Sequence, residues 1–322
     1  MPWILLAILL LFTQLFLWSS FGSYLNDKNT GGASLAGIAG IPLTPRQIES
    51  ACADIQAGRP PTLPPIVNVE TLRIACTQVE AQLQQIFRER YNAVTLPGSL
   101  TGIIPVAQNI GLILIAILTA STLGSEHAWG TVRSILARGT GRRQYLAAKL
   151  ALMVMAGIVA MTLVIVGIVL SSLVIGSLLG EPPLGAASSS WTDAAISLGK
   201  SWLALMPFIA LAAFITVITR SSAAGIALSL GYNFLEGITT AIMINLFRWF
   251  QTVADYLLGR NITAWMISGQ TDLHRAGGLG GLVGTFPGEL HAILVLMVYI
   301  LALGGLALWV FQRRDIPASG GG

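Results

Sequence analysis

Charged residues are scarce in this chain. Asp, Glu, Lys and Arg make up 10% of its 322 residues, whereas hydrophobic residues make up 54%. Soluble globular domains carry about 25% charged residues. The composition therefore excludes an ordinary soluble domain and predicts an integral membrane protein. The net charge is only +4, and we expect no nucleic-acid partner.

Patterns of residues that bind metals, nucleotides or acyl groups are also missing. The three histidines are His127, His274 and His291, and no His-Glu-x-x-His pair occurs among them. The chain has no Gly-x-Ser-x-Gly nucleophile elbow and no Gly-x-x-x-x-Gly-Lys-Ser/Thr phosphate loop. We therefore expect no catalytic site, no metal site and no cofactor bound by this chain. Energy for any active process must come from a partner or an ion gradient.

Cysteine is limited to Cys52 and Cys76. Each lies on the apolar face of an expected short helix, in the segment that follows the first apolar run. Disulfides persist outside the cytoplasm. A bridge between these two residues would contribute about 3 kcal/mol by closing a loop of this size. Two buried free thiols remain the alternative.

Six uncharged apolar runs are long enough to cross a membrane as helices. About 20 residues of helix span a hydrocarbon core of roughly 30 Å, and each run approaches or exceeds that length. The expected spans are residues 1–21, 103–123, 150–179, 201–219, 223–246 and 290–312. The first run lacks a preceding cation and a convincing cleavage site, which favours a retained span over a signal peptide. The predicted fold is an all-α integral membrane protein with six transmembrane helices.

The distribution of charge predicts which segments face the cytoplasm. Residues 124–149, Arg220 and the tail 313–322 together carry 8 basic and 2 acidic residues, whereas residues 22–102, 180–200 and 247–289 carry 10 basic and 11 acidic residues. Cytoplasmic loops carry the excess of Lys and Arg. Both termini are therefore expected in the cytoplasm. Residues 22–102 would form a helical extracytoplasmic cap, and 247–289 a pair of interfacial or re-entrant helices.

The basic segment 124–149 has the features of a short helix between two spans. We expect a helix from Leu123 to about Arg138, with Glu126 in its first turn and Arg138 in its last, as the helix dipole favours. Gly139 and Gly141 would end it. A short rigid helix held between two spans can transmit a push from a partner.

This segment resembles the first cytoplasmic loop of ABC-2 type transporter permeases. The resemblance rests on Ser125-Glu126, Gly130-Thr131, Arg133, Leu136, Arg138, Arg142-Arg143 and Lys149. The chain's ending, Phe311-Gln312-Arg313-Arg314-Asp315-Ile316, is similar to the end of the last span in that family.

The resemblance implies a permease subunit that works with a separate ABC ATPase subunit, which would hold ATP and Mg²⁺, and with a second permease protomer. It also implies export across the plasma membrane of a prokaryotic cell. The residues expected to dock the ATPase are Glu126, Gly130, Thr131, Arg133, Leu136, Arg138, Arg142 and Arg143. For Arg142 and Arg143, anchoring in anionic lipid headgroups is the alternative.

Glu236 is the only ionisable residue inside an expected span rather than at its edge. A carboxyl group there is costly and usually faces protein or water. The resemblance implies that the second and fifth spans line the transport route. This adds Asn233, Gln108 and Asn109 to Glu236 as candidate pathway residues. A helix-packing hydrogen bond or a protonated carboxyl group is the structural alternative for Glu236.

Two other functions remain open from the sequence. The chain could be an ion-coupled secondary transporter with Glu236 as its proton carrier, or a non-transporting membrane assembly or sensor protein that acts through the cap. One departure from the family pattern is the start of the chain. The basic amphipathic helix that usually precedes the first span is missing, so we expect either an upstream start or the loss of that element.

Overall fold

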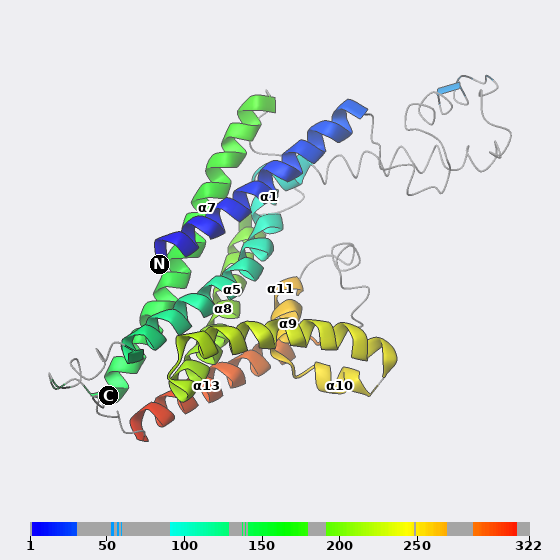
Figure 1. Cartoon of the computed structure of the whole chain (residues 1–322). Coiled ribbons are helices and arrows are strands. Elements are labelled where there is room, and N and C mark those ends of the chain that lie inside the picture. Colours follow the sequence, from blue (N-terminus) through cyan, green and yellow to red (C-terminus); the bar gives the residue numbers. More distant parts are fainter. Residues whose placement is uncertain are drawn as a thin grey trace. The chain divides into compact units, whose positions relative to one another are not determined.

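The computed structural model describes residues 2–30, 53–54, 57, 59, 91–128, 137, 139, 141–179, 191–247, 249–268 and 286–313. Helix makes up 91% of these residues and no strand occurs among them, which confirms the predicted all-α fold. The helices are α1 (Pro2–Thr30), α5 (Gly98–Ala128), α7 (Arg142–Leu179), α8 (Trp191–Thr219), α9 (Ser222–Leu246), α10 (Phe250–Ala254), α11 (Leu258–Ile267) and α13 (Glu289–Arg313) (Figure 1).

Six of the described helices are long and apolar enough to cross a membrane, which confirms the predicted number of spans. The apolar stretches are Pro2–Asn26, Gly98–Glu126, Arg142–Leu179, Trp191–Thr219, Ser222–Leu246 and Glu289–Arg313. Several of these helices are longer than the apolar runs expected from the sequence, because polar residues at their ends extend the helix without breaking it. Cys52 and Cys76 lie outside the described residues, so their bridge stays a prediction.

The chain divides into two compact units. One contains Met1–Phe12, Ile104–Val166 and Ala195–Gly322, and the other contains Thr13–Ile103 and Gly167–Ala194. The divisions fall within α1, α5, α7 and α8. The larger unit holds all the charged clusters described below.

The core of the larger unit is an apolar cluster to which α5, α7, α8 and α13 all contribute. Its buried members are Leu123, Tyr145, Leu146, Ala213, Val217, Ala307 and Phe311. Toward the middle of the helices, Gly111 of α5 lies close to Met161 of α7 and Leu205 of α8. Burial of this kind contributes roughly 25 cal/mol per Å² of apolar area in water-soluble domains, whereas packing and small residues dominate between helices in lipid.

A tight turn joins α8 to α9. Arg220 has a φ of 56°, which is the left-handed conformation that reverses a chain direction. Ser221 caps α9, because its Oγ accepts a hydrogen bond from the Ala224 N–H at 3.3 Å. Two glycines permit the close packing at this turn. A Cβ at Gly225 would lie 2.1 Å from Thr216 Oγ1, and one at Gly124 would lie 2.5 Å from the Ser222 backbone.

The smaller unit packs parts of α1, α5 and α7 through polar and apolar contacts. The Ser172 hydroxyl donates to Ser99 Oγ at 2.8 Å, and the Ser171 hydroxyl donates to Gln14 Oε1 at 2.6 Å. Leu17 and Ile175 are fully buried in this unit. Hydrogen bonds between small polar side chains are a common way to join helices in lipid.

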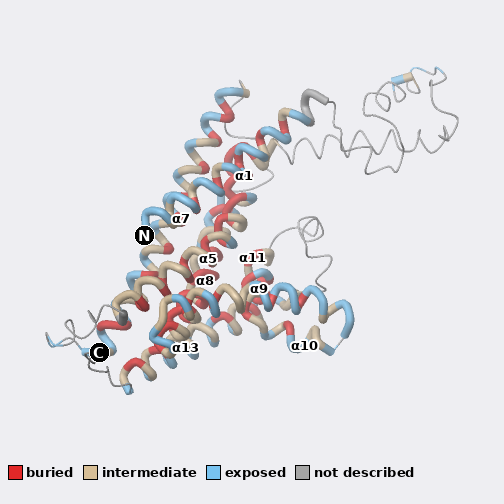
Figure 2. The backbone as a smooth tube through the Cα atoms, in the orientation of Figure 1, coloured by how far each residue is buried: buried red, intermediate tan, exposed pale blue. Residues whose placement is uncertain are grey.

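Long apolar side chains cover the outward faces of several helices. Trp3, Leu15, Leu152 and Leu170 are among those exposed, and Figure 2 shows exposed stretches along α1 and α7. Exposed apolar faces of this length are unfavourable in water but fit a hydrocarbon environment. The structure therefore agrees with a multi-pass membrane protein.

Candidate functional site

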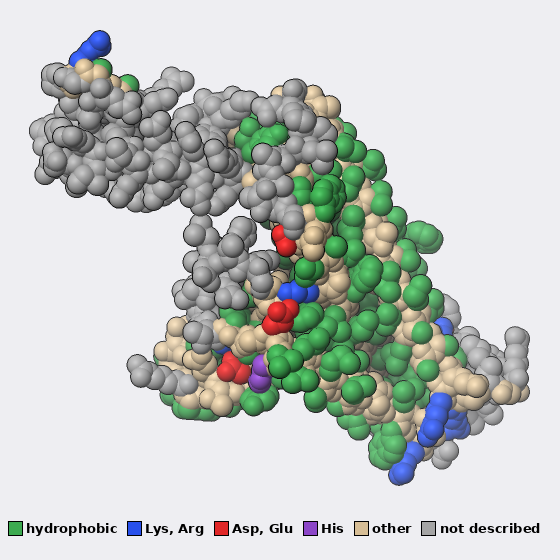
Figure 3. All heavy atoms as spheres, turned by 180° about the vertical axis from the view of Figure 1, so that it is seen from behind, with side chains coloured by type: hydrophobic (Ala, Val, Ile, Leu, Met, Phe, Trp, Pro, Cys, Tyr) green, Lys and Arg blue, Asp and Glu red, His purple; other side chains and the backbone are tan. Residues whose placement is uncertain are grey.

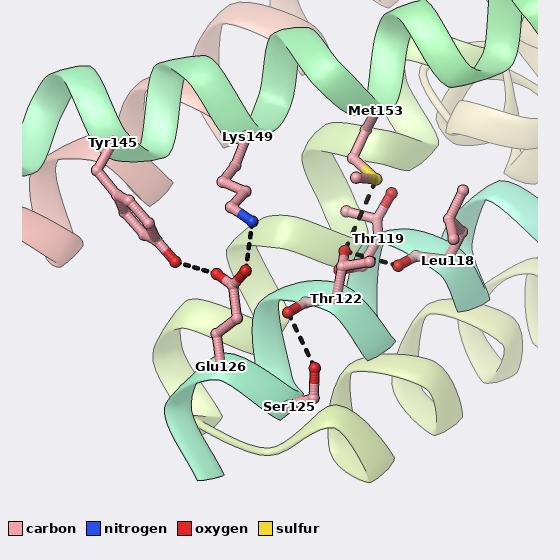
Figure 4. A network of polar contacts seen from close by, with 8 residues as sticks. All are labelled: Leu118, Thr119, Thr122, Ser125, Glu126, Tyr145, Lys149 and Met153. Atoms are coloured by element: carbon pink, nitrogen blue, oxygen red, sulfur yellow. Dashed lines mark hydrogen bonds and ion pairs between the residues drawn. The ribbon is translucent and has the colours of Figure 1, made fainter. Parts of the chain in front are cut away.

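The first candidate site lies where α5 ends and α7 begins, on either side of the basic segment. Glu126 is in the last turns of α5, and its carboxylate accepts hydrogen bonds from the Tyr145 hydroxyl and the Lys149 ammonium of α7 (Figure 4). The side chains of Lys149 and Glu126 are 23% and 21% exposed. We call this group of three residues the loop base.

The last span is tied to the loop base as well. The Tyr145 ring stacks on Phe311 of α13, with centroids 5.8 Å apart and planes inclined by 20°. The Arg142 guanidinium donates to the Gln312 carbonyl at 3.1 Å. These contacts hold together the end of α5, the start of α7 and the end of α13. A force applied to the basic segment would therefore reach three helices at once.

Basic side chains gather around the loop base. Arg143 and Arg313 are exposed and Arg142 is half-buried, and the Arg313 guanidinium lies 4.5 Å from the centroid of the Trp309 ring. Figure 3 shows Lys and Arg side chains collected at one end of the face it displays. This patch would attract an acidic protein surface or anionic headgroups.

The structure corrects one expectation about the basic segment. Leu123 and Glu126 do not start a separate helix, because α5 continues without a break from Gly98 to Ala128. Glu126 is therefore near the C-terminal end of a helix, where its charge is unfavourable to the dipole and where Lys149 compensates it. Gly139 has a φ of 90°, a conformation that favours glycine. Gly130, Thr131, Arg133, Leu136 and Arg138 lie outside the described residues.

A second cluster of charge surrounds α11, the short helix before the last span. Glu236 of α9 is 8% exposed, and its Oε1 accepts the backbone N–H of Arg260 at 2.9 Å. The Leu258 N–H donates to the Tyr232 hydroxyl, also of α9, at 3.4 Å. Since Leu258 and Arg260 are in the first turn of α11, both bonds satisfy N–H groups that lack helical partners. Glu236 is therefore a capping residue for another helix.

Lys200 of α8 makes the corresponding contacts at the other end of α11. It is 8% exposed, and its ammonium donates to the Ser268 carbonyl at 2.7 Å and to Ser268 Oγ at 2.6 Å. The Trp265 indole N–H donates to the Lys200 carbonyl at 3.1 Å. A cation at a helix C-terminus is favoured by the helix dipole. The Lys200 ammonium also lies 3.2 Å from Glu289 Oε1 of α13.

Residues 249–268, which contain α10 and α11, make further polar contacts. Arg260 Nε donates to Asp255 Oδ1 at 3.1 Å, and the Asn261 amide donates to the Asp255 and Leu257 carbonyls at 2.8 and 2.7 Å. On α13, His291 Nε2 lies 2.9 Å from the Asp255 carbonyl. These bonds hold α10, α11 and the first half of α13 together. Two short helices were expected within residues 247–289, and α10 and α11 occupy that range.

The four candidate pathway residues lie on two helices, α5 and α9, and their role stays a prediction. Gln108 is 1% exposed, and its amide nitrogen has no hydrogen-bond partner among the described residues. Asn109 is exposed and donates to the Pro105 carbonyl of its own helix at 3.0 Å. Asn233 is half-buried on α9. Among the hydrogen bonds of the described residues, none joins the pair on α5 to the pair on α9.

Three residues with clear structural roles escaped the sequence reasoning. Nothing in the sequence singled out Tyr145 or Arg260, and Lys200 was taken as the boundary of a span. A signal for Lys200 was available, because residues 191–199 contain no proline and only one charged residue. A helix that starts at Trp191 places Lys200 well inside it. The contacts of Tyr145 and Arg260 depend on tertiary packing.

Length, composition and packing of the described helices define a multi-pass, all-helical membrane protein with six candidate spans. The profile of a family described as protein of unknown function, DUF2705, matches residues 87–317. This match covers more than two thirds of the chain, so the protein belongs to that family. No curated protein and no solved structure matches the chain. The matched segment runs from just before α5 to the end of α13 and leaves α1 outside.

Proposed function

We propose that this protein is the membrane-spanning permease subunit of an ABC-2 type transporter. A separate ATPase subunit, carrying ATP and Mg²⁺, docks on the basic segment between α5 and α7. Two permease protomers, identical or different, form the transport route, and the direction is export across the plasma membrane of a prokaryotic cell. The resemblance of residues 125–149 and 311–316 to the permease loop and ending supplies the class.

The loop base is the structural observation that carries the proposal. A docking segment can transmit motion only if both of its ends are firmly attached to spans. Glu126 attaches the end of α5 to Tyr145 and Lys149 of α7, and Tyr145 stacks on Phe311 of α13. Exposed Arg143 and Arg313 add charge beside the segment. The family match also includes this segment and excludes residues 22–86, which favours a role for the spans and their loop over one for the cap.

The loop base changes how Glu126 is assigned. Its carboxylate is occupied by two partners within the chain, so we assign Glu126 to positioning the segment. Arg133, Leu136 and Arg138 remain the residues proposed to contact the ATPase. A docking test should therefore alter these residues and leave Glu126 in place.

Co-purification from membranes tests the proposal. The full chain, tagged at its C-terminus and expressed in its native cell, is extracted with mild detergent and compared with an Arg133→Glu/Arg138→Glu variant. We expect a Walker-motif ATPase to accompany the wild type and to be lost from the variant, because reversed charge repels an acidic docking groove. An Arg59→Glu variant is the control, since Arg59 is exposed and outside the family match.

Three results would speak against the permease assignment. If no ATPase accompanies the wild-type protein even after crosslinking, the proposed partner subunit is ruled out. Proton-gradient-dependent transport by the chain alone, abolished by Glu236→Gln, indicates the ion-coupled transporter. Loss of function on deleting residues 31–90, with no effect of Arg133→Glu/Arg138→Glu, indicates an assembly or sensor protein.

A further inference from the structure

Helices α8 and α9 diverge from their shared turn. The turn at Arg220 and Ser221 holds one end of each helix together, with Gly225 packed against Thr216. Figure 1 shows α9 inclined to α8 beyond this turn. Two helices joined at one end can change their angle unless a third element connects them further along.

Helix α11 makes that connection. At 1.5 Å per residue, Lys200 lies about 28 Å along α8 from Thr219, Glu236 lies about 21 Å along α9 from Ser222, and α11 is about 15 Å long. Glu236 and Tyr232 hold its N-terminus, whereas Lys200 holds its C-terminus. The three helices therefore form a closed triangle with hydrogen bonds or a covalent turn at each corner.

Charge strengthens both corners made by α11. The Glu236 carboxylate meets the positive end of the helix dipole and the Lys200 ammonium meets the negative end. Both residues are largely buried, so water competes little for these hydrogen bonds, and charged hydrogen bonds are stronger than neutral ones. Gly259 has no side chain, and a Cβ at this position would lie 3.1 Å from Glu236 Oε1. The lack of a Cβ allows the Glu236 carboxylate to approach the first turn of α11 closely.

We propose that α11 is a brace that fixes the angle between α8 and α9, and that Glu236 and Lys200 are the positioning residues that fasten its two ends. Releasing either end opens the triangle and frees α9 to move relative to α8. The brace does not rest on the proposed function, because it concerns the chain by itself.

Distance measurements between spin labels on α8 and α9 test the brace. Labels are placed at Ile196 and Ile242, which are exposed and lie beyond the corners of the triangle. The full-length chain carries alanine at positions 52 and 76 so that only the introduced cysteines react. Pulsed electron–electron double resonance then gives the distance distribution for wild type, Glu236→Gln, Lys200→Met and the Glu236→Gln/Lys200→Met double variant.

We expect a single narrow peak in the wild type and its loss in each single variant. Glu236→Gln keeps an acceptor for the Arg260 N–H and removes only the charge, so its change should be the smaller one. If one end of α11 is released, α11 no longer holds α8 and α9 at a fixed angle. The double variant should therefore be no broader than Lys200→Met alone, which is a result that two independent local contacts would not give.

Matched controls use the same substitutions at the loop base. Glu126→Gln and Lys149→Met remove an acid and a base that touch α5 and α7 and do not touch α11, so the narrow peak should persist. Unchanged distributions in all brace variants would overturn the proposal, as would additive broadening in the double variant. Elution of each variant as a folded species by size exclusion is checked first, and Glu236→Gln serves if Lys200→Met does not fold.

Discussion

The loop base and the α11 brace each use one acid and one lysine, but they use them differently. At the loop base Glu126 and Lys149 bond each other, and their side chains are 21% and 23% exposed. At the brace Glu236 and Lys200 are each 8% exposed, and each bonds the end of a third helix. The loop base is therefore a partly solvated ion pair, whereas at the brace Glu236 caps one end of α11 and Lys200, which also pairs with Glu289, caps the other.

The two pairs therefore contribute differently to stability. Partly exposed ion pairs contribute little to stability, with measured values of about 0 to 1 kcal/mol. Loss of a buried partner costs more, because a polar group is left without a hydrogen bond away from water. We therefore expect substitutions at the brace to cost more stability than substitutions at the loop base.

Glu236→Ala should cost the most stability. It removes the acceptor of the buried Arg260 N–H, and we expect a loss of about 3 kcal/mol, near the upper range for such a group. Glu126→Ala at the loop base should cost about 1 kcal/mol, because water can reach Lys149. Equilibrium unfolding of both variants in mixed detergent micelles measures the difference. Equal losses would show that the two sites are energetically alike.

Lys200→Met should cost about 2 kcal/mol, the value for a hydrogen bond to a charged group. Its methylene stem is retained by methionine, so packing against Trp265 changes little. Lys149→Met should cost less than about 1 kcal/mol. The same unfolding experiment ranks the two lysines, and a greater loss from Lys149→Met would reverse the comparison.

Tyr145→Phe isolates one bond of the loop base. It removes the hydrogen bond to Glu126 but keeps the stack on Phe311 and the Glu126–Lys149 pair. We expect a loss of about 1 kcal/mol or less. Thermal unfolding followed by tryptophan fluorescence detects the shift. A loss as large as that of Glu236→Ala would mean that Tyr145, rather than the ion pair, holds α5 to α7.

Added salt should give the smallest effect and should act mainly on the loop base. The Debye length falls from about 10 Å at 0.1 M to 3 Å at 1 M ionic strength. The penalty of Lys149→Met should shrink at high salt because the pair it breaks is already screened. The penalty of Lys200→Met should change less, since the Lys200 side chain is 9% exposed and, of its partners, Glu289 is the exposed one. Unfolding at the two ionic strengths tests this contrast, and equal salt dependence would place both lysines in the same environment.

The six spans follow from the sequence because length and apolar composition decide membrane insertion locally. Glu236 was also identifiable, as the one acid inside an apolar run. Its partner, the Arg260 backbone N–H of α11, was not identifiable, because the two residues lie 24 positions apart and meet only through packing. Of the two readings of Glu236, the contacts match the helix-packing bond, and the role of a pathway residue stays a prediction.

Lys200 and Glu126 are two residues at which the apolar runs of the sequence predicted the wrong helix boundary. The expected fourth span began at residue 201 because Lys200 was taken as its boundary, whereas α8 starts at Trp191 and buries that lysine. Glu126 was expected to begin a helix because acids favour first turns. It instead lies near the end of α5, where Lys149 and Tyr145 of α7 supply the compensation that no local rule includes.

Site-specific photocrosslinking from Leu136 is the most direct test of the proposed docking. A photoreactive amino acid replaces Leu136 in the full chain, and irradiation of intact cells is followed by mass spectrometry of the adducts. The same amino acid at Trp191, which is exposed at the far end of α8 from the turn, is the control. We predict a covalent adduct with a Walker-motif ATPase from position 136 and none from position 191. Adducts from position 136 that contain only lipid or the chain itself would contradict the account.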